Sequence, residues 1–399
     1  MAGKLDRNDK VILGVIGIGN MGTAHIKTVF DRLVPDMELG AVADRLPARR
    51  EWAKDLLAPG FPVFEEGSEL IKSGLVNAVL IAVPHYQHPP LAIESFKAGL
   101  HVLCEKPAGV YTKQVREMNK AARESGLVFA MMFNQRTNSH FRKMRELVQG
   151  GSLGAIKRTS WIITNWYRPQ AYYDSGDWRA TWAGEGGGVL LNQCPHNLDL
   201  FQWICGMPNT VRAFCHNGKW HDIEVEDDVT AYLEYPNGAT GTFITSTADA
   251  PGTNRLEITL EWGKLVNEDG TGLSLYRLDR NEREFNRSAT GGFDAPGVTV
   301  EKIETDGSNE QHLGVLKAFA GRIVHGSPLV AEGCEGIHGL TLSNAMHLSS
   351  WLDTTVKIPF DEDLFLEELN KRRAVSKLKK GTAQVFDSGK SYNAGGAPI

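Results

Sequence analysis

A glycine-rich segment near the amino terminus limits the possible folds of this chain more than any other feature. The apolar run 11–16 leads into Gly17, Gly19 and Gly22 in the spacing G-x-G-x-x-G, and a helical pattern follows to Phe30. The first glycine permits a tight turn, the second lets a pyrophosphate approach the backbone, and the third allows helix and strand to pack closely. The helix N-terminus attracts the phosphates. The segment therefore predicts a dinucleotide-binding Rossmann domain.

The residues after the next apolar run indicate which dinucleotide is bound. The run 39–43 ends at Asp44, where a carboxylate would bond the adenosine ribose hydroxyls of NAD. Arg45 follows directly, and an arginine at this place can instead hold the 2′-phosphate of NADP. The sequence predicts NAD as the cofactor, with NADP as the alternative.

Composition excludes several classes of protein. A net charge of −5 and a pI near 6.2 do not favour a nucleic-acid partner. The amino terminus is charged, and no run of about 18 apolar residues occurs, so neither a signal peptide nor a membrane span is predicted. The five cysteines are scattered without a C-x-x-C pair, which is typical of reduced thiols. We expect a cytoplasmic protein.

The hydrophobic periodicity divides the 399 residues into two domains and a tail. Alternating strands and helices predict a doubly wound parallel sheet over 1–136, the NAD-binding domain. Longer runs with period-two alternation predict a mainly antiparallel sheet over 137–360, closed by helices at 312–325 and 336–352. This second domain is expected to bind substrate and to form a homodimer or homotetramer. Residues 361–399 are predicted as a helical or extended tail.

Two further motifs carry the candidate chemistry. Glu105, Lys106 and Pro107 follow an apolar strand, where an α/β sheet places ligand-facing groups. In the second domain, a glycine run leads through Asn192 to His196, with Asp199 on the same helical face. A histidine flanked by an amide and a carboxylate suits a proton acceptor, although taken alone a structural histidine is the more common case.

A zinc site is the competing interpretation of the second motif. Cys194, His196 and Asp199 are ligand types that fit zinc. No further ligands cluster near them in the sequence, and nicotinamide chemistry of this kind needs no metal. We therefore predict no metal site.

The motifs together resemble the Gfo/Idh/MocA family of sugar and inositol oxidoreductases over roughly residues 1–355. The resemblance implies an amino-terminal Rossmann domain and a carboxy-terminal α/β domain whose large open antiparallel sheet commonly mediates oligomerisation. It also implies that Lys106 contacts the reacting oxygen and the nicotinamide, and that His196 is the general acid/base. Members bind NAD or NADP and oxidise or reduce a ring hydroxyl or carbonyl.

This chain departs from the commonest family pattern at one position. Asn192 stands where an aspartate usually precedes the histidine, and an amide cannot hold a proton or a charge. An aspartate-dependent proton relay is therefore in doubt, and Lys106 and His196 are left as the working pair. The Asn192-Gln193 variant resembles a branch of the family associated with glycosides and pyranoses.

The remaining predicted contacts surround this pair. His85, His88 and Gln135 follow apolar strands and are expected at the cofactor edge, although capping or packing is an equal alternative for the two histidines. The predicted cofactor contacts are Gly17, Gly19, Asn20, Met21, Gly22, Asp44, Arg45, Pro84, His85, His88, Glu105, Lys106 and Gln135. Aromatic and arginine side chains between 165 and 182 suit a pyranose ring, and about half of the aromatics are expected to serve packing instead. The predicted substrate contacts are Lys106, Tyr167, Arg168, Trp178, Asn192 and His196.

Three functions are compatible with these residues. The leading prediction is an NAD-dependent dehydrogenase that transfers hydride to or from a ring hydroxyl or carbonyl of a pyranose, glycoside or inositol. The first alternative is an NAD-dependent glycosidase that oxidises its substrate transiently, eliminates the aglycone and returns the hydride. The second is a non-catalytic NAD-binding sensor, against which the presence of both Lys106 and His196 argues.

Overall fold

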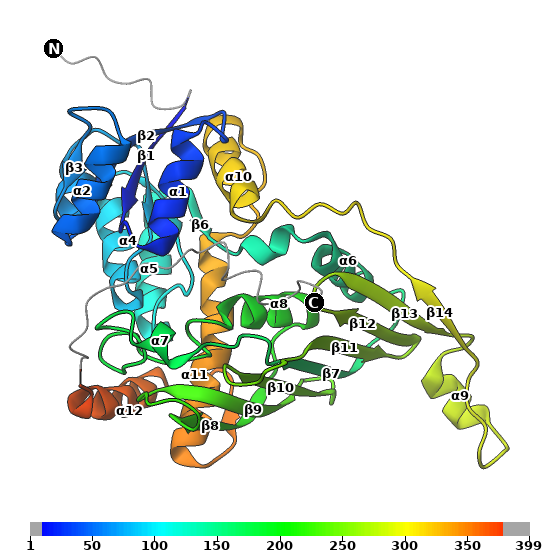
Figure 1. Ribbon diagram of the computed structural model, residues 1–399. Helices are drawn as coiled ribbons and strands as arrows, with labels where there is room; N and C mark the ends of the chain where they lie inside the picture. Colours follow the sequence, from blue (N-terminus) through cyan, green and yellow to red (C-terminus); the bar gives the residue numbers. More distant parts are fainter. Residues whose placement is uncertain (1–9, 378–399) are drawn as a thin grey trace.

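The amino-terminal domain is built on a parallel sheet of six strands in the order β3-β2-β1-β4-β5-β6 (Figure 1). The computed structural model describes residues 10–377. The strands are β1 (Val11–Ile16), β2 (Met37–Ala43), β3 (Val63–Phe64), β4 (Ala78–Ile81), β5 (His101–Cys104) and β6 (Phe129–Met131). Their apolar side chains are buried because helices cover both faces of a doubly wound sheet. The predicted Rossmann architecture is confirmed.

Helices of this domain alternate with its strands. They are α1 (Asn20–Phe30), α2 (Pro47–Leu56), α3 (Gly67–Lys72), α4 (His88–Lys97) and α5 (Thr112–Ser125), with short 3₁₀ turns η1 (His85–Gln87) and η2 (Asn134–Thr137). The β1–α1 connection is the glycine segment, and η1 begins at His85, shortly after β4 ends at Ile81. Cofactor-side elements therefore meet at the carboxyl edge of the sheet, where open α/β sheets bind ligands.

The second sheet has nine strands in the order β14-β13-β12-β11-β7-β10-β9-β8-β15. These are β7 (Ile156–Ile163), β8 (Thr210–Asn217), β9 (Glu226–Glu234), β10 (Thr240–Ser246), β11 (Asn254–Leu260), β12 (Gly263–Glu268), β13 (Gly272–Leu278), β14 (Val298–Lys302) and β15 (Val356–Lys357). Only the β7–β10 pair among these strands is parallel. The predicted, mainly antiparallel sheet is confirmed.

Helices cover one face of this second sheet. They are α6 (Ser139–Gln149), α8 (Pro195–Cys205) and α11 (Gly336–Leu352), and the short α7 (Gln170–Tyr173), α9 (Glu282–Ser288) and η3 (Gly333–Glu335) lie in connections. The rings of Phe201 on α8 and Trp161 on β7 have centroids 6.2 Å apart. At the other end, Ser349 Oγ on α11 accepts from the Ala213 amide on β8 at 2.9 Å. The opposite face carries exposed side chains such as Phe214 and Tyr232.

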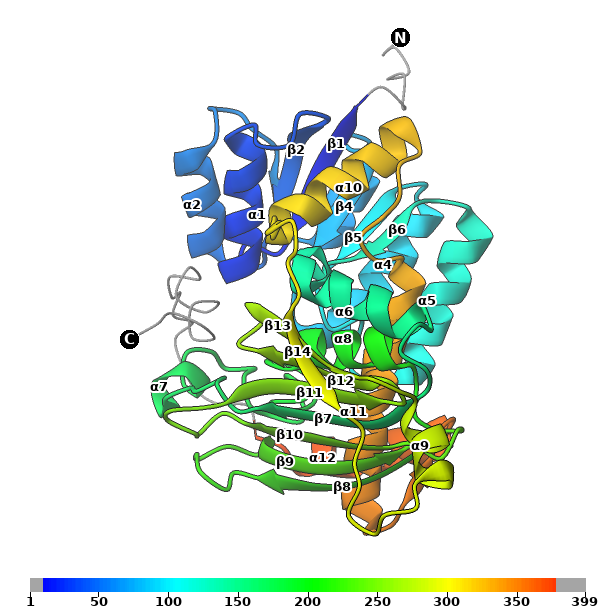
Figure 2. The same ribbon diagram turned by 90° about the vertical axis from the view of Figure 1, so that its right-hand side faces the viewer.

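Helix α10 (Gln311–His325) does not close the second domain, and that prediction is wrong. The buried side chains of Val315, Leu316 and Phe319 share one apolar core with Val11 and Leu13 of β1. Figure 2 shows this helix lying across the amino-terminal sheet. An apolar helical stripe shows only that a helix must be covered, so periodicity could not tell which of the two sheets receives it.

The carboxy-terminal segment begins with α12 (Glu362–Val375), and residues 378–399 of the predicted tail lie outside the described part of the chain. Phe365 stacks on Trp351 of α11 with centroids 5.3 Å apart. Arg116 of α5 donates to Glu362 at 2.7 Å, so the segment joins both domains. None of the helices between residues 10 and 377 combines the length and apolar character that spanning a bilayer requires.

Candidate active site

The glycine turn has the shape that a pyrophosphate requires. A Cβ on Gly17, whose φ is 95°, would lie 2.4 Å from the Ala82 carbonyl oxygen. A Cβ on Gly22 would lie 1.8 Å from the Gly17 oxygen, whereas Gly19 has open space within 4 Å of that position. Gly19 is also the N-cap of α1 and has no side-chain cap. The outer glycines thus pack the turn closely, and the middle one leaves room beside free N–H groups.

Asp44 lies against the glycine turn. Its Oδ2 accepts from the Ile18 amide at 2.6 Å and its Oδ1 from the Leu46 amide at 2.8 Å. The neighbouring Arg45 points its guanidinium to Glu66 at 2.9 Å, and its side chain is 72% exposed. A carboxylate is therefore fixed beside the turn, while the adjacent arginine has a partner of its own.

Lys106 extends from the end of β5 to the second domain. Its Nζ donates to the Asn192 backbone oxygen at 2.8 Å. Burial lowers the pKa of Lys106. The preceding Glu105 accepts from the Lys106 amide at 3.2 Å and from His25 Nε2 on α1 at 2.7 Å. Although burial opposes ionisation, the hydrogen bond and charge of His25 lower the pKa of Glu105 to about 2.

His196 lies in the first turn of α8 with its ring enclosed. The residue is 4% exposed, and neither Nδ1 nor Nε2 has a hydrogen-bond partner among residues 10–377. Burial, followed by the charge of Lys106, lowers the pKa of His196 well below its ordinary value. The imidazole is therefore neutral near pH 7, with one nitrogen able to accept a proton. Buried polar groups are normally hydrogen-bonded, so the two unpartnered nitrogens leave this ring able to bond a ligand.

Asp199 does not orient His196, contrary to what their shared helical face suggested. Its two oxygens accept from Arg136 at 2.6 and 2.7 Å, and the same guanidinium also binds Glu335. The long arginine of η2 reaches the carboxylate, and a contact between segments so far apart in sequence is invisible to helical spacing. Between residues 10 and 377, no three His, Cys, Asp or Glu side chains are grouped to hold a metal ion.

The aromatic segment contributes two of its three predicted substrate residues to the buried site region. Arg168 is 8% exposed, with its guanidinium over the Trp166 and Tyr172 rings at 5.6 and 5.2 Å. Trp178 lies with its ring 5.7 Å from that of His85. Tyr167 is 48% exposed. After burial, the charges of Arg179 and Arg168 in this segment also lower the pKa of Lys106.

Three residues beyond the predicted sites belong to the same region. Arg179 donates to the Tyr172 hydroxyl at 3.0 Å and lies over the Trp178 ring at 4.6 Å. Both are among the aromatic and arginine side chains between 165 and 182 that the sequence indicated, but not among the three selected as substrate contacts. Glu185 is 2% exposed, and its carboxylate accepts from the Ala180 amide at 2.6 Å and from the Asn192 side chain. Only its position before the glycine run could have drawn attention to it.

The predicted cofactor-edge residues His85, His88, Gln135 and Pro84 differ in their contacts within the protein. His88 places its two ring nitrogens 2.7 and 2.8 Å from the Pro107 and Val83 carbonyl oxygens, which fixes the loop containing Lys106. His85 Nδ1 lies 3.2 Å from the Glu185 backbone oxygen. Gln135 donates to Gln311 at 3.1 Å, which connects η2 to α10, and Pro84 is exposed. The packing alternative therefore describes His88 well, and cofactor contact stays a prediction for all four.

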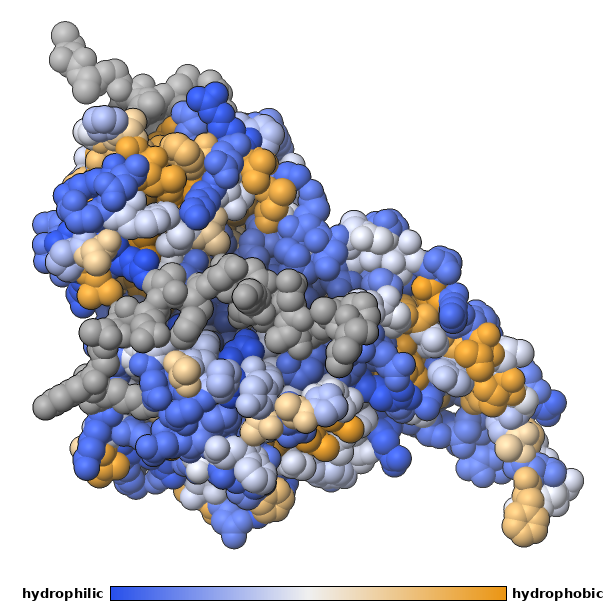
Figure 3. Space-filling model, viewed as in Figure 1, coloured by the Kyte–Doolittle hydropathy of each residue, from blue (hydrophilic) through white to orange (hydrophobic). Residues whose placement is uncertain are grey.

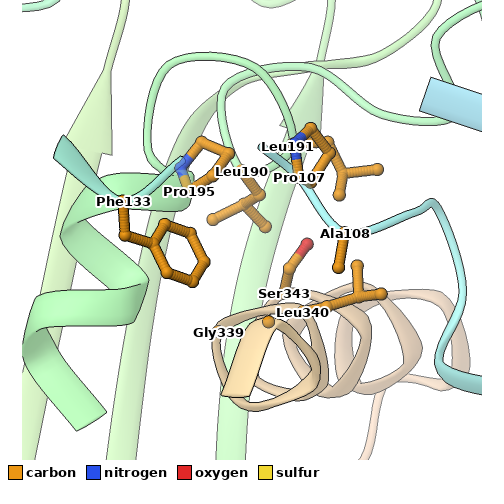
Figure 4. A pocket seen from close by; sticks show the side chains of 10 residues that line it. Pro107, Ala108, Phe133, Leu190, Leu191, Pro195, Gly339, Leu340 and Ser343 are labelled. Atoms are coloured by element: carbon orange, nitrogen blue, oxygen red, sulfur yellow. The ribbon is translucent and has the colours of Figure 1, made fainter. Parts of the chain in front are cut away.

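A small apolar cavity is lined by the chain neighbours of Lys106 and His196. Figure 4 shows α11 forming its floor, opposite the loop that carries Pro107 and the start of α8 at Pro195. Its lining residues are Pro107, Ala108, Phe133, Leu190, Leu191, Pro195, Gly336, Gly339, Leu340 and Ser343. Each of the two prolines is a direct chain neighbour of a candidate catalytic residue. An apolar backing of this kind strengthens the electrostatic interactions in front of it.

Both domains match known family models. Residues 11–133 match the oxidoreductase family with an NAD-binding Rossmann fold, and residues 141–266 match the GFO/IDH/MocA C-terminal domain. Myo-inositol 2-dehydrogenase of Thermotoga maritima is 25% identical over 352 residues, which span 87% of this chain and 98% of that protein. Rhizopine catabolism protein MocA of Rhizobium meliloti is 28% identical over 198 residues, 50% of this chain and 58% of MocA. That match spans little more than half of MocA.

Solved structures share the fold. The WlbA dehydrogenase of Bordetella pertussis, solved in complex with NADH and UDP-GlcNAcA, is similar with a TM-score of 0.73 at 24% identity. The likeness covers 88% of this chain and all 100% of that one. With both domain models matched in order along the sequence, the chain belongs to the Gfo/Idh/MocA family of NAD-binding oxidoreductases.

Proposed function

We propose that this protein transfers hydride between NAD(H) and a ring hydroxyl or carbonyl of a pyranose, glycoside or inositol. The observation that carries the proposal is the pairing of Lys106 with His196, whose buried ring has two unpartnered nitrogens. An inositol dehydrogenase among the relatives and a sugar-nucleotide complex of WlbA support a polyhydroxylated six-membered ring as substrate.

The residues divide the work of the reaction between them. When bound, the nicotinamide would exchange the hydride. Neutral His196 accepts the proton of the substrate hydroxyl, and it returns that proton when a carbonyl is reduced. The ammonium of Lys106 stabilises the negative charge that develops on the same oxygen. The apolar side chains behind both residues keep water away from the reacting groups.

The flanking side chains suit a carbohydrate ring. Arg168 and Arg179 offer donors to hydroxyl oxygens, and their guanidinium groups lie over the Tyr172 and Trp178 rings. We infer that these four residues, with Asn192, set substrate preference. The cofactor proposed is NAD rather than NADP because the Asp44 carboxylate lies beside the glycine turn while Arg45 is paired with Glu66.

The decisive experiment is a screen for NADH formation with myo-inositol, free pyranoses and alkyl or aryl glycosides. We expect stoichiometric NADH with members of one of these classes. Release of aglycone from a chromogenic glycoside without net NADH would instead identify transient oxidation and elimination. Tight NAD binding without turnover of any of these compounds would contradict the proposed catalysis and support a sensor.

We also propose that the protein is a homodimer or homotetramer. Phe214 and Tyr232 on the uncovered face of the second sheet are 49% and 44% exposed, and Val298 and Val300 on its edge strand β14 are 56% and 61% exposed. Figure 3 shows apolar surface on the part of the molecule where β13 and β14 project. Exposed apolar side chains at both ends of the sheet favour contact with another copy of the chain. Light scattering at micromolar concentration should report more than one copy, and a monomer would contradict the proposal.

A further inference from the structure

A buried carboxylate contacts the residue that departs from the family pattern. Glu185, 2% exposed, accepts a hydrogen bond from the Asn192 side-chain nitrogen. Its second oxygen accepts from the Ala180 amide at 2.6 Å. The carboxylate is therefore held in place by two donors. An asparagine at position 192 lacks the negative charge of the usual aspartate. In the structure, the carboxylate of Glu185 lies beside the Asn192 side chain.

Asn192 connects this carboxylate to the candidate catalytic lysine. Its side chain donates to Glu185, while its backbone oxygen accepts from Lys106 Nζ at 2.8 Å. An amide whose NH₂ group donates to a carboxylate keeps its carbonyl oxygen available as an acceptor. Removal of Glu185 would therefore leave the orientation of the Asn192 amide unfixed.

The carboxylate of Glu185 is one of several charges that affect the protonation of Lys106. Glu105 and Glu185 favour the ammonium form of Lys106, and Arg179 and Arg168 oppose it. Burial raises the pKa of Glu185, while Arg179 and the hydrogen bonds from Ala180 and Asn192 oppose that rise and favour its ionised form. His85 completes the surroundings through its contact with the Glu185 backbone oxygen.

We propose that Glu185 is a positioning residue that supplies, from the preceding segment, the negative charge that Asn192 cannot carry. The proposal rests on the function proposed above. In this role Glu185 orients the Asn192 amide toward the substrate and keeps Lys106 protonated. The usual aspartate is thus replaced by two residues, an amide at position 192 and a carboxylate behind it.

The protonation of Lys106 is the first measurement, because it needs no substrate. Competitive acetic anhydride labelling across pH, followed by mass spectrometry of the peptide containing Lys106, gives the titration midpoint of its amine. Glu185→Gln should move this midpoint to lower pH, because the nearby negative charge is lost. The matched control is Asp177→Asn, which removes an exposed carboxylate from the same segment and should leave the midpoint unchanged.

The second measurement compares removal of the carboxylate with its transfer to position 192. Glu185→Gln should lower kcat on the order of tenfold while NAD binding is kept. The double variant Glu185→Gln with Asn192→Asp returns a carboxylate to the site, and it should recover most of the lost kcat and restore the Lys106 midpoint. Asn192→Asp alone places two carboxylates together, so one of them should titrate at higher pH than usual.

An unchanged Lys106 midpoint in Glu185→Gln would overturn the inference, as would a double variant no better than the single one. Should Glu185→Gln fail to fold, Glu185→Asp keeps the charge and withdraws it from Asn192, so kcat must fall while the Lys106 midpoint stays close to that of the unmodified protein. An unchanged kcat in Glu185→Asp also overturns the inference. These results are distinct from failure of the proposed function, which would appear as absence of NADH formation by the unmodified protein.

Discussion

Two clusters of buried polar side chains lie close to α8. The complete cluster is Arg136 with Asp199 and Glu335, and the incomplete cluster is His196 with Lys106; they differ in how fully their hydrogen bonds are satisfied. Arg136 binds Asp199 through two hydrogen bonds and also binds Glu335, so its charge is fully met within the protein. His196, one turn before Asp199 on the same helix, has no partner for either ring nitrogen within residues 10–377. The difference shows that burial alone does not identify an active site. Hydrogen bonds met within the protein suit the first cluster to holding the fold, and the unpartnered ring of the second is what the proposed function requires.

The largest effect is expected from breaking the complete cluster. Asp199→Ala should lower the free energy of unfolding by about 3–5 kcal/mol, because it leaves a buried guanidinium without its main partner. Denaturant unfolding measures this change. Glu335→Gln is the matched control, since Glu335 is 36% exposed and its loss should cost much less. Normal stability of Asp199→Ala with abolished turnover would instead place Asp199 in the reaction.

The incomplete cluster should show the opposite behaviour. His196→Ala and Lys106→Ala should each reduce kcat by about a hundredfold or more, because a positioned acid/base or charge-stabilising group is lost. NAD binding should persist, and His196→Ala should leave the hydrogen bonds of the fold intact. Steady-state kinetics with cofactor titration tests both variants. Near-normal turnover in His196→Ala would remove the proposed base.

How far the sequence predicts this molecule depends on the range of the interactions involved. Strand and helix periodicity and the glycine spacing are local, so the parallel sheet, the antiparallel sheet and the exit of Lys106 from β5 were all predicted. The position of α10, the Arg136–Asp199 pairing and the burial of Glu185 depend on contacts between distant segments. No local pattern records such contacts, and for this reason the sequence assigned α10 to the wrong sheet and Asp199 to the wrong partner.

The histidines His196 and His312 should make the stability of the protein depend on pH. Burial lowers the pKa of His196, and it lowers the pKa of His312 to about 4. Both rings are therefore neutral when folded, while the unfolded chain binds protons below about pH 6.5. Stability should fall as pH drops from 6.5 toward 4, because unfolding then takes up protons. Urea unfolding across this range should show a weaker pH dependence in His312→Gln than in the unmodified protein, and an identical dependence would contradict the assignment.

The smallest effect concerns Asp44, a carboxylate at the edge of the glycine turn whose oxygens accept from the Ile18 and Leu46 amides. Because Asp44 would repel a 2′-phosphate, we expect NAD to bind more tightly than NADP. Asp44→Ala should narrow this preference on the order of tenfold, through weaker NAD binding and relief of the repulsion. Arg45→Gln is the control, since that side chain is paired with Glu66 and should change NAD affinity little. Calorimetric titration with both cofactors gives the ratio, and tighter NADP binding by the unmodified protein would reverse the assignment of the cofactor.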